Sequence, residues 1–241
     1  AADTRLVEAF FNWDGDALER SDYVGVYVIT DQLEVEPGRL DLEELAASDN
    51  SGEALTGGYV LEIDEIADNK YHWRTDNGYP KEELSQVLID TPKLDEITPE
   101  QIDYIKTYVQ DMENALLSDR ESNWRERRYL QYLDRQSWLD YHMVMTFVKN
   151  VDAFWRGAKL YKNRGERMKS GPVWDFDRSL ASTDPRDNIP SEWDATEFTS
   201  QGFAVKYWDE GWWGLLAKDP DFIRAWFDRW QELRAGLLTD T

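Results

Sequence analysis

Two carboxylates flank a phenylalanine in the sequence GPVWDFDRSL, residues 171–180. In an extended chain the side chains alternate between two faces, so Asp175 and Asp177 would point one way and Trp174 and Phe176 the other. Two carboxylates at one spot can hold a divalent cation, because Mg²⁺ is typically bound by one or two carboxylates together with phosphate and water oxygens. We therefore expect a strand here, with buried aromatic residues behind a candidate metal site.

A third carboxylate, Asp152, lies 23 positions upstream of Asp175 (175 − 152) and directly follows an apolar stretch. Residues 134–150 are hydrophobic around nearly the whole circumference of a helix, which predicts a buried helix capped by Asp134 or Ser137. A carboxylate at the end of a buried helix is well placed to be held rigidly at a cleft. The alternative interpretation is that Asp152 is only a turn residue that ends the helix.

The local charge around these carboxylates differs from that of the whole chain. From Lys149 to Arg178 there are eight basic and four acidic residues, a local excess of +4 in a chain of formal charge −22. Cations interleaved with carboxylates suit a metal–nucleotide site, in which cations hold phosphate oxygens and carboxylates hold Mg²⁺. Residues 164–169 also fit an ordinary solvated turn. Lys162, Asn163 and Arg178 are the candidate cofactor-binding residues.

The composition excludes several classes of function. The chain has 241 residues, of which 27 are basic and 49 acidic, and this balance argues against binding to nucleic acid or to an anionic membrane. Cysteine is absent, which excludes disulfides and thiolate zinc sites, and two histidines leave little scope for histidine-based metal or triad chemistry. No apolar run approaches the roughly 20 residues that a membrane span needs, and the first residues do not resemble a signal peptide.

Strand composition dominates the first third of the chain. Residues 5–12, 23–34 and 57–64 are rich in β-branched and aromatic side chains and are separated by polar, glycine-containing segments. We expect them to form one small antiparallel sheet. Two further short strands are expected at 158–162 and 171–177, joined by a polar turn.

Helical spacing begins after this part. Apolar residues recur at steps of three and four over residues 102–116, and Thr98 with Gln101 forms a capping box in front of them. Residues 211–238 are expected to end the chain with helix, and the stretch 219–237 within them has an Asp-Pro start and a glycine near its end.

This order of elements predicts an α+β fold. We expect a single domain over residues 1–241, with a β-rich part at 1–90 packed on a mostly helical part at 91–241 that carries the site. A strand-rich part over a helical part is one way to form a cleft.

The run WLDYHMVMTFVKNVDAFWRGAKLYKNRGERMKSGPVWDFDRSLAST, residues 138–183, resembles the core of the CotH kinase family. The segments YVGVYVITDQLE, TGGYVLEID and FIRAWFDRWQELRAG resemble further parts of that family in the same order, so the resemblance covers nearly the whole chain. It implies an atypical protein-kinase-like fold. It also implies transfer of the γ-phosphoryl group of ATP, bound with Mg²⁺ or Mn²⁺, to a hydroxyl group of a protein substrate.

The resemblance implies roles for individual residues. Asp152 matches the catalytic-loop aspartate, which orients and deprotonates the attacking hydroxyl, and Asp175 matches the metal-binding aspartate. Asp177 would be a further metal ligand. Members of the family often occur on surfaces or in secreted proteins, so the resemblance and the acidity lead us to expect an extracellular or cell-surface location.

The chain departs from the family pattern in three places. Gly157 stands where many members carry Asn or Ser, Asp31 stands where a Glu is usual, and the family has further strands upstream of residue 5, where a phosphate-binding lysine is expected. These departures support an alternative, a catalytically impaired pseudokinase or a surface interaction module.

A more distant alternative is a carbohydrate-active or carbohydrate-binding protein, suggested by twelve tryptophans and paired carboxylates. However, two carboxylates on one strand cannot flank a glycosidic bond from opposite faces. The spacing of Trp208, Trp212 and Trp213 is also more typical of a core than of a sugar platform.

Overall fold

The computed structural model describes residues 4–30, 35–36, 38, 40–80, 85–182, 185–189, 191, 193 and 207–239. The chain forms two compact units, Ala1–Leu42 and Glu43–Thr241, and each is described by itself. This division differs from the expected boundary between residues 90 and 91. The expectation of a single domain stays a prediction.

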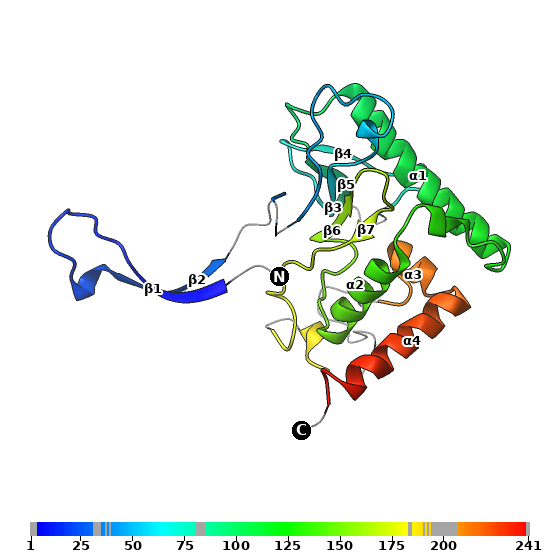
Figure 1. The fold of residues 1–241 in the computed structure, drawn as a ribbon. Helices are drawn as coiled ribbons and strands as arrows, with labels where there is room; N and C mark the ends of the chain where they lie inside the picture. The colour runs from blue at the N-terminus through cyan, green and yellow to red at the C-terminus, as the bar shows by residue number, and fades with distance from the viewer. Residues whose placement is uncertain are drawn as a thin grey trace. The chain divides into compact units, whose positions relative to one another are not determined.

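The first unit is an antiparallel hairpin of β1 (Thr4–Phe10) and β2 (Tyr23–Thr30), shown in Figure 1. A 3-10 turn, η1 (Arg20–Asp22), leads into β2. In the register of the hairpin, Leu6 lies opposite Val28. The described parts of the predicted strands at 5–12 and 23–34 are strands over β1 and β2. Asp31, which departs from the family pattern, lies outside the described residues.

The second unit contains a five-stranded sheet in the order β4-β5-β3-β6-β7, with all neighbours antiparallel. Its strands are β3 (Tyr59–Glu65), β4 (Tyr71–Trp73), β5 (Ser85–Thr91), β6 (Ala158–Lys162) and β7 (Lys169–Ser170). The predicted strands at 57–64 and 158–162 are confirmed. The prediction of one sheet for the N-terminal strands is wrong, because β1 and β2 pair only with each other among the described strands, while β3 recruits β6 from far along the chain.

The described residues of the second unit also form four helices, grouped with the sheet in Figure 1: α1 (Pro99–Glu121), α2 (Arg135–Phe147), α3 (Gly211–Leu216) and α4 (Pro220–Ala235). Short 3-10 turns occur at η2 (Ala54–Thr56), η3 (Arg128–Gln131) and η4 (Pro185–Asp187).

The helix starts follow the sequence closely. The backbone N–H of Gln101 donates to Oγ1 of Thr98 at 3.3 Å, and the Thr98 N–H donates to Oε1 of Gln101 at 3.1 Å, so the predicted capping box is confirmed. Asp134 caps α2 through the N–H of Ser137 at 2.8 Å. Strands toward the N-terminus and helices toward the C-terminus make the fold α+β, as predicted.

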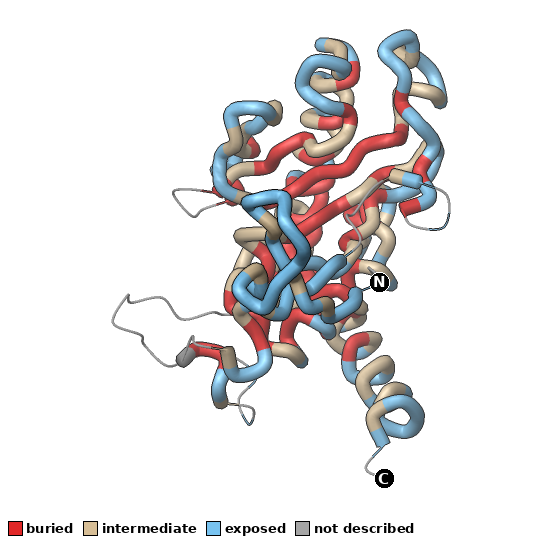
Figure 2. Tube along the Cα trace, turned by 90° about the vertical axis from the view of Figure 1, so that its left-hand side faces the viewer, coloured by how far each residue is buried: buried red, intermediate tan, exposed pale blue. Residues whose placement is uncertain are grey.

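The hydrophobic core lies between one face of the sheet and the helices, and buried residues run along both in Figure 2. Leu61 of β3 and Leu160 of β6 contribute from the sheet, and Trp138 contributes from α2. The ring of Trp138 lies 4.8 Å from that of Trp213 in α3. Trp212 and Trp213 are both buried, which confirms that this tryptophan pair belongs to the core.

His142 of α2 is buried in this core, and its ring takes part in polar contacts with Tyr207, Trp226 and, at 3.5 Å, the hydroxyl of Thr146. Its Nε2 lies 2.9 Å from the carbonyl oxygen of Tyr207, and its Nδ1 lies 3.1 Å from Nε1 of Trp226. An indole N–H only donates, so Nδ1 accepts and Nε2 carries the proton of a neutral imidazole. Burial lowers the pKa of His142 from 6.5 to about 4, and the hydrogen bond to Tyr207 only partly opposes this shift.

This arrangement predicts a loss of stability in mild acid. Because the folded-state pKa of His142 lies below the unfolded value, the unfolded chain binds the proton more readily, and stability is lost as pH falls from 6.5 toward 4. Below pH 4 the lost free energy of unfolding amounts to about 3 kcal/mol. Urea unfolding of the native chain and of His142→Gln between pH 7 and pH 4 tests this, and the native chain should lose more stability. Parallel losses in the two proteins would contradict it.

Candidate active site

Two chain segments meet at the C-terminal end of α2, and each brings one of the predicted carboxylates. Asp152 lies in the turn that follows α2, and Asp175 lies in the irregular segment that follows β7. The segments run side by side, since the N–H of Val151 donates to the carbonyl of Arg178 at 3.2 Å and the N–H of Leu180 donates to the carbonyl of Val148 at 3.0 Å. Residues 23 positions apart in the sequence are thus brought to one place.

The predicted strand at 171–177 is wrong. β7 ends at Ser170, and Asp175 has a left-handed backbone with φ of 57°. Pro172 has no N–H to continue the ladder, and the left-handed residue breaks the extended geometry that alternation requires. The aromatic residues consequently do not form a buried row: Phe176 packs against the core but Trp174 is 36% exposed.

Asn150 connects the two segments through its side chain. Its Nδ2 donates to the carbonyl oxygen of Asp175 at 2.7 Å, and its Oδ1 accepts from the N–H of Asp152 at 3.0 Å. The residue itself is only 4% exposed, and both bonds are partly buried. Nothing in the sequence alone indicates this role of Asn150, although the residue forms part of the motif on which the resemblance rests.

The carboxylate of Asp152 is mostly buried, with 16% of its side chain exposed. Nη1 of Arg178 contacts both of its oxygens, at 3.0 and 3.2 Å. Burial raises the pKa of Asp152 above its usual value, and the positive charges of Arg178, Arg156 and Arg186 oppose that shift. The group is therefore a partly desolvated carboxylate with an arginine partner.

Asp175 and Asp177 also lie close together. Burial raises the pKa of Asp175, and the neighbouring carboxylate of Asp177 and the charge of Asp152 raise it further. Such mutual repulsion is relieved by a proton or by a bound cation. Within the described residues no group of three or more acidic or histidine side chains is arranged to hold a metal ion. A cation at these two carboxylates would need further oxygen ligands, of the kind that phosphate and water supply to Mg²⁺.

Gly157 lies beside Asp175. A Cβ atom built on Gly157 would lie 3.9 Å from Cβ of Asp175, which is an ordinary contact distance. The backbone of Gly157 is left-handed, with φ of 71°. The position where many family members carry Asn or Ser therefore faces the candidate metal ligand, but here it offers no side chain.

Lys162 is placed elsewhere. Its ammonium group is buried, donates to the carbonyl oxygens of Thr56 and Glu166, and lies over the rings of Tyr104 and Tyr108. Burial lowers the pKa of Lys162 to about 8. The structure does not bring Lys162 to the carboxylates, and its predicted contact with a nucleotide stays a prediction.

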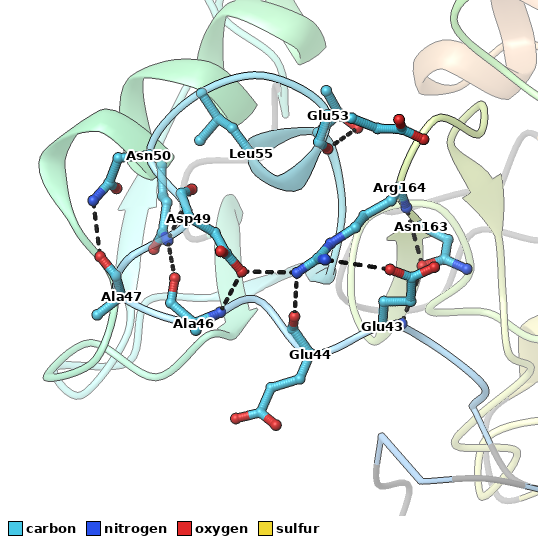
Figure 3. A network of polar contacts seen from close by, with 12 residues as sticks. Glu43, Glu44, Ala46, Ala47, Asp49, Asn50, Glu53, Leu55, Asn163 and Arg164 are labelled. Atoms are coloured by element: carbon cyan, nitrogen blue, oxygen red, sulfur yellow. Dashed lines mark hydrogen bonds and ion pairs between the residues drawn. The ribbon is translucent and has the colours of Figure 1, made fainter.

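Asn163 belongs to the polar network drawn in Figure 3, which holds the segment before β3. Its Oδ1 accepts from the N–H of Glu43 at 3.1 Å and from that of Arg164 at 3.0 Å. The Arg164 guanidinium in turn contacts Asp49 at 2.7 Å and the carbonyl oxygen of Glu44 at 2.6 Å. These contacts account for Asn163 structurally, and its role toward a cofactor also stays a prediction.

Lys159 and Glu62 form a buried ion pair on the face of the sheet that turns away from the helices. Glu62 also accepts from Lys70, which contacts Asp90 at 2.7 Å. The ammonium group of Lys159 lies 5.8 Å from the centre of the Trp174 ring, next to Asp175 in the chain. The sequence analysis did not single out this pair, because acidic and basic residues occur throughout the chain.

A pocket of about 570 Å³ opens beside the same two segments. Its lining includes Phe147, Leu180 and Trp193, all of them substantially exposed. Lys149 and Leu180, which also line it, have left-handed backbones with φ of 54° and 57°. Such conformations cost energy in non-glycine residues and occur often at functional sites. The pocket provides space close to the segment that carries Asp152.

A family model described as CotH kinase protein matches residues 1–241. The chain belongs to the CotH kinase family. No curated protein and no solved structure gave a match. Membership of this family assigns the chain, at a coarse level, to the kinase-like phosphotransferases. Asp152 and Asp175 both lie in residues 138–183, the segment whose motifs resemble the core of the family.

In the part of this CotH kinase protein that the structure describes, no helix combines the length and the apolar character needed to cross a bilayer.

Asn150→Ala tests the connection between the two segments. The substitution leaves the Asp175 carbonyl and the Asp152 N–H of this CotH kinase protein without their partners, which should cost about 2 kcal/mol or more in free energy of unfolding. Urea denaturation measures this cost. The matched control is Asn114→Ala on the exposed side of α1, which should change stability by less than about 0.5 kcal/mol. Similar midpoints for the two variants would show that the Asn150 bonds contribute little.

Proposed function

We propose that this protein transfers the γ-phosphoryl group of ATP, bound with Mg²⁺ or Mn²⁺, to a hydroxyl group of a protein substrate. The observation that carries the proposal is the placement of Asp152 next to Asp175 through Asn150. Asp152 would accept a proton, and Asp175 with Asp177 would bind a cation. This combination is what phosphoryl transfer requires of a protein.

The carboxylates would divide the work. Asp175, with Asp177 beside it, would hold the metal ion, which when bound neutralises charge on the phosphate oxygens. Asp152 would orient the acceptor hydroxyl and take its proton. A partly desolvated carboxylate is a better base than one in bulk water, and the raised pKa of Asp152 fits that role.

Positioning accounts for most of the expected rate enhancement, because phosphoryl transfer demands little covalent chemistry from the protein. Asn150 fixes the backbone at both Asp152 and Asp175, so the base and the metal ligand keep a constant separation. The pocket lined by Val148, Lys149 and Leu180, from the same two segments, would offer room for part of the protein that carries the acceptor hydroxyl. An extracellular or cell-surface location is part of the proposal and is motivated by the acidity of the chain.

A second candidate function is that of a pseudokinase or surface interaction module. It is favoured by Gly157, which faces Asp175 without a side chain that could complete a metal site. The two candidates differ in whether Mg²⁺·ATP binds and in whether phosphate is transferred.

Calorimetric titration of Mg²⁺·ATP into the native chain tests the proposed function. We expect binding to the native chain and its loss in Asp175→Ala, because that variant lacks the main metal ligand. Asp228→Ala on the exposed face of α4 is the matched control and should bind like the native chain. Absence of binding to the native chain would overturn the proposal and favour the interaction module.

Asp152→Ala separates chemistry from binding. We expect this variant to bind Mg²⁺·ATP and to lose phosphate incorporation into a protein acceptor by at least about a hundredfold, because it lacks the general base. Incorporation of radiolabelled phosphate at equal nucleotide saturation is the measurement. Undiminished incorporation would show that Asp152 is not the base.

Gly157→Asn tests whether the missing side chain weakens the metal site. An amide oxygen next to Asp175 should tighten Mg²⁺-dependent ATP binding by about tenfold, which corresponds to about 1.4 kcal/mol. Asparagine tolerates the left-handed backbone better than most residues do. The control, Gly157→Ala, should cost about 1 kcal/mol of stability without tightening binding. Calorimetry measures the affinity of the native chain and both variants for Mg²⁺·ATP. Equal affinities would show that the side chain at position 157 does not affect the metal site.

A further inference from the structure

Arg178 lies where the two segments of the site touch. It directly follows Asp177 in the chain, and its carbonyl oxygen accepts from the N–H of Val151 at 3.2 Å. Its guanidinium reaches back to Asp152, where a single nitrogen, Nη1, contacts both carboxylate oxygens at 3.0 and 3.2 Å. Arg178 is thus connected to the Asp152 segment by its backbone and by its side chain.

We propose that Arg178 is a positioning residue for Asp152, which holds the carboxylate ionised and in place, and that it is not a ligand of the nucleotide phosphates. This inference rests on the proposed function for the meaning of Asp152, but the pairing itself does not depend on that function. Arg178 was predicted from the sequence to bind the cofactor, and under this proposal it instead keeps the general base Asp152 ionised and in position.

The need for such a residue follows from burial. A carboxylate that is largely withdrawn from water loses hydration and tends to take up a proton unless a positive charge lies next to it. Arginine suits this task because it stays charged at every accessible pH and offers several donors in a fixed plane. A neutral Asp152 could not accept the proton of an incoming hydroxyl.

The other charges around Asp152 are arranged differently. Arg156 donates its Nη2 to Glu65 and lies over the ring of Trp155, so its charge is shared with another carboxylate. Arg186 is buried in η4 and acts on Asp152 through its charge. The carboxylate of Asp175, from the other segment, repels Asp152. Among the described residues, only Arg178 contributes a side chain that hydrogen-bonds to Asp152.

Position in the chain gives Arg178 a second property. It is one residue away from Asp177 and three from Asp175, so any shift of the carboxylate pair on cation binding is carried to the arginine through the backbone. The proton acceptor and the metal ligands would then respond together. A lysine at this place would preserve the charge, but it would hold the carboxylate through a flexible stem.

The first test needs no enzymatic activity. The side-chain carboxyl carbon of Asp152, assigned with Asp152→Asn, is titrated by NMR in the native chain, in Arg178→Gln and in Arg178→Lys. We expect the midpoint to move to higher pH in Arg178→Gln and to stay closer to the native value in Arg178→Lys. Arg224→Gln, at an exposed site on α4, is the matched control and should leave the midpoint unchanged. An unchanged midpoint in Arg178→Gln would overturn the proposal.

The second test separates positioning from phosphate binding. In Arg178→Gln, kcat should fall by about tenfold or more, and the acidic limb of its pH profile should move to higher pH. The dissociation constant of Mg²⁺·ATP, measured by calorimetry, should change by less than about threefold, or about 0.6 kcal/mol. A tenfold weaker affinity with an unmoved Asp152 titration would instead make Arg178 a phosphate ligand.

The two tests distinguish failure of the proposed phosphoryl transfer from failure of the proposed role of Arg178. If the native chain binds no Mg²⁺·ATP, the proposed function fails, and the NMR titration still decides whether Arg178 controls Asp152. If Arg178→Gln does not fold, Arg178→Lys is compared with the native chain. A lysine variant whose Asp152 midpoint and kcat both equal the native values would contradict the requirement for a planar, fixed donor.

Discussion

The side chain of Asn150 is the contact on which the geometry of the site depends. One amide group satisfies a donor at Asp152 and an acceptor at Asp175, and it does so where water has little access. Its two bonds fix backbone atoms of Asp152 and Asp175, so the spacing of the two segments is set by the chain itself. The proposed phosphoryl transfer requires a constant distance between Asp152 and Asp175. The buried, hydrogen-bonded amide of Asn150 maintains that distance.

Electrostatics sets the second constraint. Burial raises the pKa of Asp175 and that of Asp152, and at Asp152 the guanidinium of Arg178 opposes the shift. Asp177 and Asp152 both raise the pKa of Asp175 further through their charges, in a protein that already carries a formal charge of −22. Among the described contacts, the pair at Asp175 and Asp177 has no comparable cation of its own. This difference suits the proposed roles. Asp152 must stay ionised without a metal in order to act as a base, whereas a bound cation would stabilise the ionised forms of Asp175 and Asp177.

Local patterns in the sequence predicted the helices and their caps, whereas Asp152 and Asp175 were paired through the resemblance to the CotH kinase family. The prediction of a strand at 171–177 was wrong because alternation assumes an extended backbone, and neither the proline nor the left-handed Asp175 maintains one. The roles of Asn150 and Arg178 depend on contacts between distant segments, which spacing alone does not reveal. Lys162 shows the converse: a cation near the site in sequence is engaged by carbonyl groups and tyrosine rings.

The central position of β3 has a consequence for how the molecule is assembled. β3 lies between β5, which follows it closely, and β6, which arrives almost a hundred residues later. Until the later segment has been synthesised and docked, one side of β3 presents unpaired backbone groups, the kind of edge to which other strands readily add. The segments bearing Asp152 and Asp175 flank β6 and β7 in the sequence, so the docking of these strands also brings the two segments together. A chain interrupted before β6 would therefore have neither a paired edge on β3 nor the candidate site.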